Sequence, residues 1–467
     1  MPITVSRSPR VLVLLVAALL LAFVPASTAD ARGGPPAGTP GAAVRDAGAH
    51  EVWSLDQGTD LIHVYDSRFD LEEVATIDLR PIALAAIEPD AINPEVTAST
   101  VPHMIEFDSQ YRYAFVAATA SARTIVIDAR SKEVVAVLAT GAGTHMAAVT
   151  PDDSAVWVAA IGAGELVEIP LDLDAAEPSF EIDRRVDVRA ELEPLAEDQG
   201  WTFPGYQPVC HQFTPDSREA WVTLGPGWNT GGLFVLDLES AEITHAWDPA
   251  EVKANCGVGV NPQGTRVIAN WSGRVAAGDD SEGEWYVFDA GSKELLKTES
   301  ARGFDAHGVR FTPDGRNIWA VNRNSDNALL IDARSFEVVR EFDRFADTPD
   351  ILDFSPDGSL VYVSQRGPNP RSGALHAAQG SQPGVAVAHT GSGRTLRVLE
   401  PPTVVGGADS QHEGRVINDI HGVGVRPIPA AELAKGRPSH SLVRASTVAT
   451  STPASREQLS FGCHIVR

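Results

Sequence analysis

Between residues 50 and 427 the chain alternates apolar and polar residues in short runs that end in turn-forming residues. Four segments show the pattern most plainly: HMAAVTPDDSAVWVAAI (145–161), CGVGVNPQGTRVIANW (256–271), HGVRFTPDGRNIWAVNR (307–323) and DILDFSPDGSLVYVSQR (350–366). Alternation with a period of two is typical of half-buried strands, and a proline-containing turn separates the two strands of each segment. A third strand with an Asp turn follows, as in TIVIDARSKEVVAVL (124–138), so each repeat predicts four antiparallel strands.

The repeats can be counted by the residue that lies six positions before the turn proline, which is replaced by Ser109 in the first repeat. That position holds, in chain order, His103, His145, Val209, Cys256, His307, Asp350 and His421. The seventh repeat contains only its first strand, while three surplus strands lie within residues 50–79. Pairing the C-terminal strand with these N-terminal strands would close a ring without open sheet edges. We therefore predict an all-β, seven-bladed β-propeller over residues 49–427.

The repeat resembles that of the YVTN-repeat family of β-propellers. The resemblance is carried by RYAFVAATASARTIVIDARSKEVVAVLATG (112–141) followed by HMAAVTPDD (145–153), and it covers roughly residues 50–427. It implies the propeller fold and, because members of that family are often extracellular, a location outside the cytoplasm. It implies almost nothing about function, since one fold carries many activities.

The N-terminus has the features of a secretory signal. Arg7 and Arg10 precede an apolar run at 11–24, and Ala-Asp-Ala at 29–31 fits a cleavage site. We expect a secreted protein, extracellular or periplasmic, with no membrane span after signal removal; an uncleaved N-terminal anchor is the alternative. The predicted division is a signal peptide at 1–31, a disordered tail at 32–48, the propeller at 49–427 and a C-terminal tail at 428–467.

The chain carries 37 Lys and Arg against 62 Asp and Glu, a formal net charge of −25. Such acidity argues against nucleic acid and anionic membrane surfaces as partners. The three cysteines, Cys210, Cys256 and Cys463, are too few for a disulfide framework, although a Cys210–Cys256 bridge stays open. Dinucleotide and phosphate-loop motifs are absent from the sequence, as is the Cys-x-x-Cys-His motif, so we expect no nucleotide and no covalent haem.

In a propeller blade the first strand lines the central channel, and its first residue lies at one channel mouth. His211 replaces Val209 as the candidate in the third blade, because it lies two residues further along the strand and has the same parity. These are metal-ligand residue types, and we predict a transition-metal site, copper or iron in preference to zinc. The candidate ligands are His103, His145, His211, His307, His421, Cys256 and Asp350.

Further residues are expected around this mouth. Asp305 and Asp419 each precede a candidate histidine by two positions and are expected to orient imidazoles from behind. Loops between second and third strands, together with two long insertions at 173–208 and 367–420, are expected on the same face and predict a binding surface. Its candidate ligand-binding residues are Trp201, Tyr206, Trp271, Arg274, Arg323, Arg366 and His412. The arginines favour an anionic or carbonyl ligand, unless each pairs with a loop Asp.

Three functional hypotheses follow from these patterns. The first is a secreted metalloprotein that binds a small molecule, with a metal-dependent oxidoreductase favoured if it is an enzyme. The second is a non-enzymatic scaffold that binds a protein, glycan or small molecule through its loop face. The third is a lactonase-type or lyase-type propeller that uses His and Arg without a redox metal. A weaker likeness of the histidine ring to nitrous oxide reductase implies copper, but the chain lacks that enzyme's cupredoxin domain.

Overall fold

The computed structural model describes most of the repeat region of the chain. It covers residues 44, 47–85, 99–175, 178–225, 231–276, 278, 280–373, 377–408, 410, 412–433, 436 and 439–445. The predicted signal peptide and most of the predicted N-terminal tail lie outside the described residues. No helix in the described ranges is long and apolar enough to cross a membrane.

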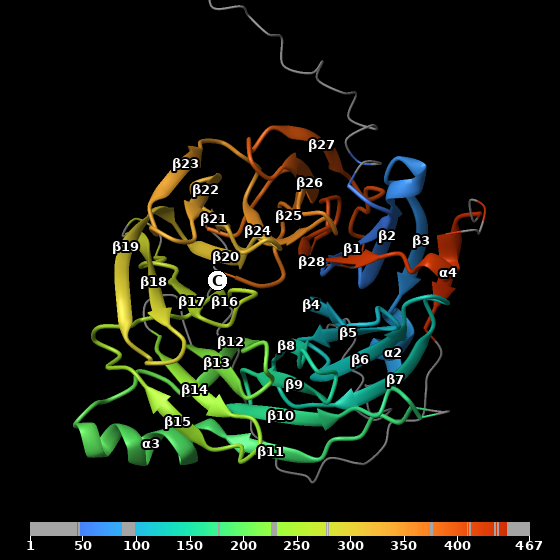
Figure 1. Ribbon diagram of the computed structural model, residues 1–467. Helices are drawn as coiled ribbons and strands as arrows, with labels where there is room; N and C mark the ends of the chain where they lie inside the picture. The colour runs from blue at the N-terminus through green and yellow to red at the C-terminus, as the bar shows by residue number, and fades with distance from the viewer. Residues whose placement is uncertain are drawn as a thin grey trace, which may run out of the picture. The chain divides into compact units, whose positions relative to one another are not determined.

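Seven antiparallel sheets form the blades of a ring, which Figure 1 shows nearly face-on. Blade 1 contains β4 (Pro102–Phe107), β5 (Tyr113–Ala118), β6 (Arg123–Asp128) and β7 (Val134–Ala139); blade 2 contains β8 (Thr144–Val149), β9 (Ala155–Ala160), β10 (Glu165–Pro170) and β11 (Arg184–Asp187); blade 3 contains β12 (Gln207–Phe213), β13 (Glu219–Gly225), β14 (Leu233–Asp237) and β15 (Ile243–Ala246); blade 4 contains β16 (Val258–Val260), β17 (Arg266–Trp271), β18 (Glu282–Asp289) and β19 (Leu295–Phe304).

The remaining elements complete the ring. Blade 5 contains β20 (Ala306–Phe311), β21 (Asn317–Asn322), β22 (Asn327–Asp332) and β23 (Val338–Phe342); blade 6 contains β24 (Pro349–Phe354), β25 (Leu360–Gln365), β26 (Gly384–His389) and β27 (Thr395–Leu399); blade 7 contains β28 (Ile420–Pro427), β1 (His50–Asp56), β2 (Leu61–Asp66), β3 (Glu72–Asp78) and β29 (Ser441–Arg444). The helices are η1 (Ser67–Phe69), α2 (Arg80–Ala85), α3 (Val188–Gln199) and α4 (Ala430–Leu433).

Blade 7 joins the two ends of the propeller, as the count of strands predicts. β28 pairs with β1 antiparallel from His50↔Pro427 to Asp56↔Ile420. The segment expected as a C-terminal tail departs from that expectation in part, because β29 pairs parallel with β3 and adds a fifth strand to the blade. The physical reason is that the outer edge of β3 offers unpaired backbone groups, which β29 satisfies.

A β-bulge interrupts the first strand of the blades at the channel position. In blade 1 the pairing with β5 shifts between Pro102 and Met104, so His103 is the extra residue. The same shift falls at His145 in blade 2, and around His307 and Asp350 in blades 5 and 6. A bulge leaves its extra residue outside the ladder and re-aims the side chain. The repeat therefore presents one side chain per blade to the channel independently of strand parity.

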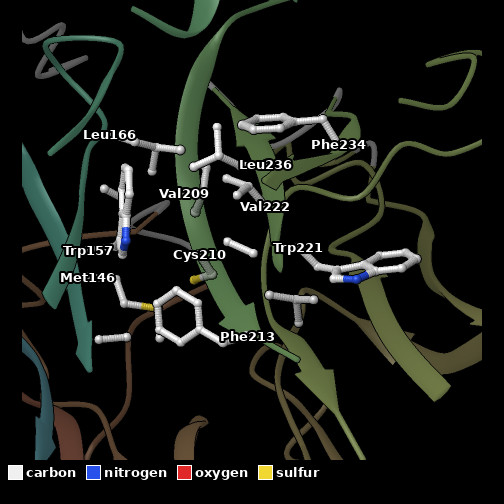
Figure 2. Packing of buried hydrophobic residues seen from close by; sticks show 14 of the residues in the cluster. Met146, Trp157, Leu166, Val209, Cys210, Phe213, Trp221, Val222, Phe234 and Leu236 are labelled. Atoms are coloured by element: carbon white, nitrogen blue, oxygen red, sulfur yellow. The ribbon is translucent and has the colours of Figure 1, made fainter. Parts of the chain in front are cut away.

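Neighbouring blades pack through apolar faces that alternate along their strands. Figure 2 shows Met146, Trp157 and Leu166 of blade 2 facing Val209, Phe213 and Leu236 of blade 3. All six side chains are buried, and burial of such large apolar groups stabilises the fold by roughly 2 kcal/mol each.

A lysine from one blade also contacts a tryptophan of the blade before it. Lys132 Nζ, in the β6–β7 turn, lies 4.8 Å from the ring centroid of Trp53 and 2.7 Å from Glu51 Oε2 in blade 7. Although burial opposes the negative charge, Lys132 and Arg426 hold the pKa of Glu51 below its usual value. The blade 3–blade 4 junction repeats the arrangement with Trp221, Glu219 and Lys293. The Lys132–Glu51 ion pair therefore links blade 7, which closes the ring, to blade 1.

Replacing Lys132 by Met should destabilise the protein by about 2 kcal/mol, because Glu51 loses one buried partner and keeps Arg426. Urea unfolding of the whole chain measures the change. The Lys132→Met/Glu51→Gln double variant should recover part of the loss. Equal unfolding midpoints for wild type and Lys132→Met would show that the buried pair does not stabilise the ring.

Candidate metal centre

Side chains from three consecutive blades converge at the channel mouth. His307 comes from β20, Asp350 from β24 and His421 from β28. One ligand atom from each side chain lies within 4.8 Å of the others, and this is the trio of metal-ligand type found among the described residues. All three are among the predicted ligands. The bulged first strands of blades 5, 6 and 7 therefore bring part of the predicted set to one point.

Two atoms of the trio approach closely without forming a hydrogen bond. His307 Nδ1 lies 2.5 Å from Asp350 Oδ1. Both atoms are buried, and neither has a hydrogen-bond partner among the described residues. Buried polar atoms are normally satisfied, and leaving one without a partner costs about 1–3 kcal/mol. These two atoms contact each other as an ion pair and have no further hydrogen-bond partner among the described residues, so a cation bound here would replace that contact alone.

The third member of the trio is oriented by the backbone. His421 Nδ1 lies 3.0 Å from the carbonyl oxygen of His103, which can only accept, so Nδ1 carries the proton. Nε2 then keeps its lone pair, and it lies 3.7 Å from Asp350 Oδ2. A ring NH donated to a backbone carbonyl is a common way of orienting a metal-binding imidazole. Burial lowers the pKa of His421 well below its ordinary value, so the ring is neutral near pH 7.

Two buried arginines hold the carboxylate. Arg366 donates from Nη1 to Asp350 Oδ2 at 2.8 Å, and its Nε and Nη2 each donate to Asp419 at 2.8 Å. Arg323 donates from Nε and Nη2 to Asp305 at 2.7 and 3.0 Å. Although burial alone would raise the pKa of Asp350, the facing imidazoles and guanidinium groups hold it well below its usual range.

These bonds correct two predictions. Asp305 and Asp419 bind arginines instead of imidazoles, because a buried guanidinium needs carboxylate partners more than a neutral ring does. Arg323 and Arg366, expected at an exposed rim, are 1% and 0% exposed. Their positions behind Asp350 make them part of the site's support.

His103 and His145 form a separate pair. Gln57 accepts from Ser372 Oγ at 2.8 Å and from Arg366 Nη2 at 3.3 Å through Oε1, which turns its amide Nε2 toward His103 Nδ1 at 2.6 Å. His103 Nδ1 is then an acceptor, and Nε2 carries the proton that it shares with His145 Nε2 at 2.9 Å. With its proton on Nε2, His103 is a hydrogen-bond donor at the edge of the trio. Its ring stacks on His421 at a centroid distance of 3.8 Å.

Gln57 is a functional residue that the sequence analysis missed. It directly follows β1, the second strand of blade 7, and so occupies the register position of Arg323 after β21 and Arg366 after β25. Aligning the residue after each second strand would have found it. The three side chains approach the trio from three adjacent blades.

His211, the predicted ligand of the third blade, is not part of the trio. In β12 the register shift encloses Val209 and Cys210, so parity does not carry through to His211. His211 Nε2 instead bonds the backbone oxygen of Trp157 in blade 2 at 3.0 Å. Burial lowers the pKa of both His211 and His145 to about 4, which keeps these rings neutral.

Cys256, also a predicted ligand, lies beside the trio as a buried thiol. Burial raises its pKa well above the usual value, and burial raises the pKa of Cys210 to about 12. Both cysteines are free, so the bridge that the sequence left open is not formed in this structure. A thiol with a raised pKa is a poor ligand, because the thiolate is the binding form.

The remaining predicted ligand-binding residues occupy three places. Trp271 lies under Lys253, whose Nζ is 4.6 Å from the ring centroid, and Arg274 is exposed nearby. Trp201 and Tyr206 follow α3, which Figure 1 shows beside β15, and Arg189 stacks on Tyr206. His412 contacts Arg371 in the second insertion. Among the described residues, that insertion bonds directly to the site, because Ser372 binds Gln57 and the Arg371 amide binds Asp419.

Comparisons with known proteins support the fold and leave the chemistry open. No protein family and no curated protein matches the sequence. Among solved structures, the chain is similar to a chain of hydrazine synthase from Kuenenia stuttgartiensis, with 12% identity and a TM-score of 0.51. The match covers 71% of this chain and 90% of that chain. At this identity it shows a shared propeller architecture, and the resemblance to the YVTN-repeat family stays a prediction.

Replacing Arg366 by Met should destabilise the protein by about 3–5 kcal/mol, because Asp350 and Asp419 lose a partner where no water replaces it. Arg316→Met is the matched control, since its pair with Asp314 is largely exposed and should contribute about 0–1 kcal/mol. Chemical denaturation of both variants gives the difference. Similar losses in the two variants would contradict the role assigned to the buried network.

Proposed function

We propose that this protein is a metalloprotein that binds one divalent transition metal through His307 Nδ1, Asp350 and His421 Nε2. The observation that carries the proposal is the convergence of His307, Asp350 and His421, in which His307 Nδ1 and Asp350 Oδ1 have no hydrogen-bond partner among the described residues. The carbonyl oxygen of His103 holds the ring of His421 so that its Nε2 lone pair stays free. A set of three protein ligands leaves positions for a small molecule, as expected of a reactive centre.

The donor set favours iron. Two imidazoles and one carboxylate with open positions are typical of non-haem iron(II) sites, while copper usually takes more nitrogen donors. Zinc is also held by such sets in hydrolytic enzymes, so both metals are offered to the purified protein. Bound metal would polarise a ligand oxygen or exchange electrons with it. We accordingly propose a secreted, metal-dependent oxidoreductase.

Neighbouring residues orient the three proposed ligands. Arg366 fixes the carboxylate that would bind the metal, and the backbone oxygen of His103 fixes the ring of His421. Burial excludes water from the trio, which strengthens every charge interaction inside it. Gln57 holds one imidazole tautomer at the edge of the site.

A binding scaffold is the second candidate function, and one observation favours it. The opposite channel mouth has a cavity of about 360 Å³ lined by Glu106, Tyr111, Arg310 and Asp353. Arg310 joins Asp353 at 2.6 Å and Glu106 at 2.7 Å across this mouth. A propeller without metal would use this cavity or the insertion face for its partner.

The metal site is tested by adding iron(II), copper(II) or zinc(II) to the purified protein and measuring bound metal by mass spectrometry. Wild type should hold about one equivalent, and His307→Ala or His421→Ala should weaken binding about 100-fold or more. His211→Gln is the matched control, because His211 bonds Trp157 away from the trio and should keep full binding. Failure of wild type to take up any of the three metals would overturn the proposal and favour the scaffold.

Metal should also stabilise the folded chain. Free metal at about 100 times Kd should add about 2.7 kcal/mol to the free energy of unfolding, because it binds the native state alone. Thermal unfolding with and without a chelator measures the effect. The His307→Ala/His421→Ala double variant should show no chelator-dependent shift in Tm. A shift that persists in this variant would place the stabilising metal elsewhere.

A further inference from the structure

The buried carboxylates and guanidinium groups around the trio carry a net charge, and a bound metal changes its sign. Three carboxylates, Asp305, Asp350 and Asp419, face two guanidinium groups, those of Arg323 and Arg366. The network therefore carries one net negative charge, and a divalent cation would turn this into one net positive charge. A net charge in a water-excluded site is costly unless a partner of opposite sign is present.

The histidines do not change this balance. His307 and His421 must be neutral to bind a metal. His103 Nδ1 accepts the amide proton of Gln57, so it carries no second proton. His145 Nε2 accepts from His103 in turn. The charge that completes the site must therefore come from outside the network.

One donor in the site is left over after the internal bonds are made. Arg323 uses Nε and Nη2 for Asp305. Its Nη1 has no hydrogen bond among the described residues, and it lies 3.6 Å from Asp350 Oδ1, the oxygen that faces His307. The neighbouring Gly373, at φ +89°, lies close to this nitrogen, since an added Cβ would lie 3.3 Å from Nη1. Arg323 thus presents a guanidinium NH beside the point where the trio converges.

We propose that the ligand of this centre is a small carboxylate monoanion, with one oxygen on the metal and the other accepting from Arg323 Nη1. The inference rests on the proposed metal centre and assigns its ligand class. Arginine suits this role because its planar donor fork is always charged and carboxylates bind it with well-defined geometry. A monoanion brings the metal-loaded network from one net positive charge to zero. Arg323 is accordingly the specificity-determining residue of the site.

The test uses cobalt(II) as a spectroscopic probe in the full-length protein. Cobalt uptake is measured first, and the visible spectrum is then titrated with acetate and with acetamide, its neutral isostere. Acetate should bind the wild type at least about tenfold more tightly than acetamide, because only acetate makes a charge-assisted bond and neutralises the centre. The preference should fall by about tenfold in Arg323→Met/Asp305→Asn, whose two changes leave the net charge unaltered.

Two controls separate the ligand claim from the metal claim. Cobalt affinity of the double variant is measured first, and acetate and acetamide are then compared on the cobalt-loaded form, so that a change in metal affinity does not enter the preference. Arg274→Met, on an exposed loop of the same face, should keep the acetate preference. Equal binding of acetate and acetamide by cobalt-loaded wild type, or a preference that survives in the double variant, would overturn the ligand class and leave the metal centre standing. Absence of cobalt uptake would overturn both.

Discussion

The buried guanidinium of Arg366 is the group on which the site depends. It lies at the seam between blades 6 and 7, where it binds Asp350 on one side, Asp419 on the other and Gln57 beyond. A buried cation must be surrounded by acceptors, and these acceptors come from segments more than 300 residues apart along the chain. The same bonds that satisfy it orient the carboxylate of the trio and the amide that sets the tautomer of His103. Ring closure and site geometry are therefore coupled through one side chain.

The repeated bulge is the second constraint. Each first strand must enter the channel from a loop, and the extra residue at this point faces the axis whichever residue type it is. The same shift occurs in the first strands of six blades, which therefore form equivalent positions that can hold different residues. This chain places metal-ligand types at His307, Asp350 and His421, and hydrogen-bonding imidazoles at His103 and His145. One fold carries many activities, so it is these side chains that distinguish the protein.

Much of the site could be predicted because the repeat aligns equivalent positions. His307, Asp350 and His421 were found by their distance from the turn proline, and no contact information was needed. The prediction that His211 belongs to the ligand set relied on strand parity. The bulge in β12, at Val209 and Cys210, interrupts that parity, and the sequence pattern does not reveal a bulge. Asp305 and Asp419 lie close to the trio, as predicted, but they bind arginines instead of the predicted imidazoles. These arginines come from other segments of the chain. Gln57 could have been found from the register after each second strand, as Arg323 and Arg366 were.

The sequence by itself determined the number of blades, the four-strand repeat and the closure of the ring, because alternation of apolar residues and turn chemistry are local properties of the chain. It also determined which residues start the first strands. Only the tertiary structure decided which of the histidines meet, since His145 and His103 pair with each other while His307 and His421 face Asp350. It alone decided that two arginines lie behind the carboxylate. Such contacts depend on how the seven blades are arranged around one axis and on which residues pair with the buried charges. Both involve residues of different repeats, so no single repeat determines them.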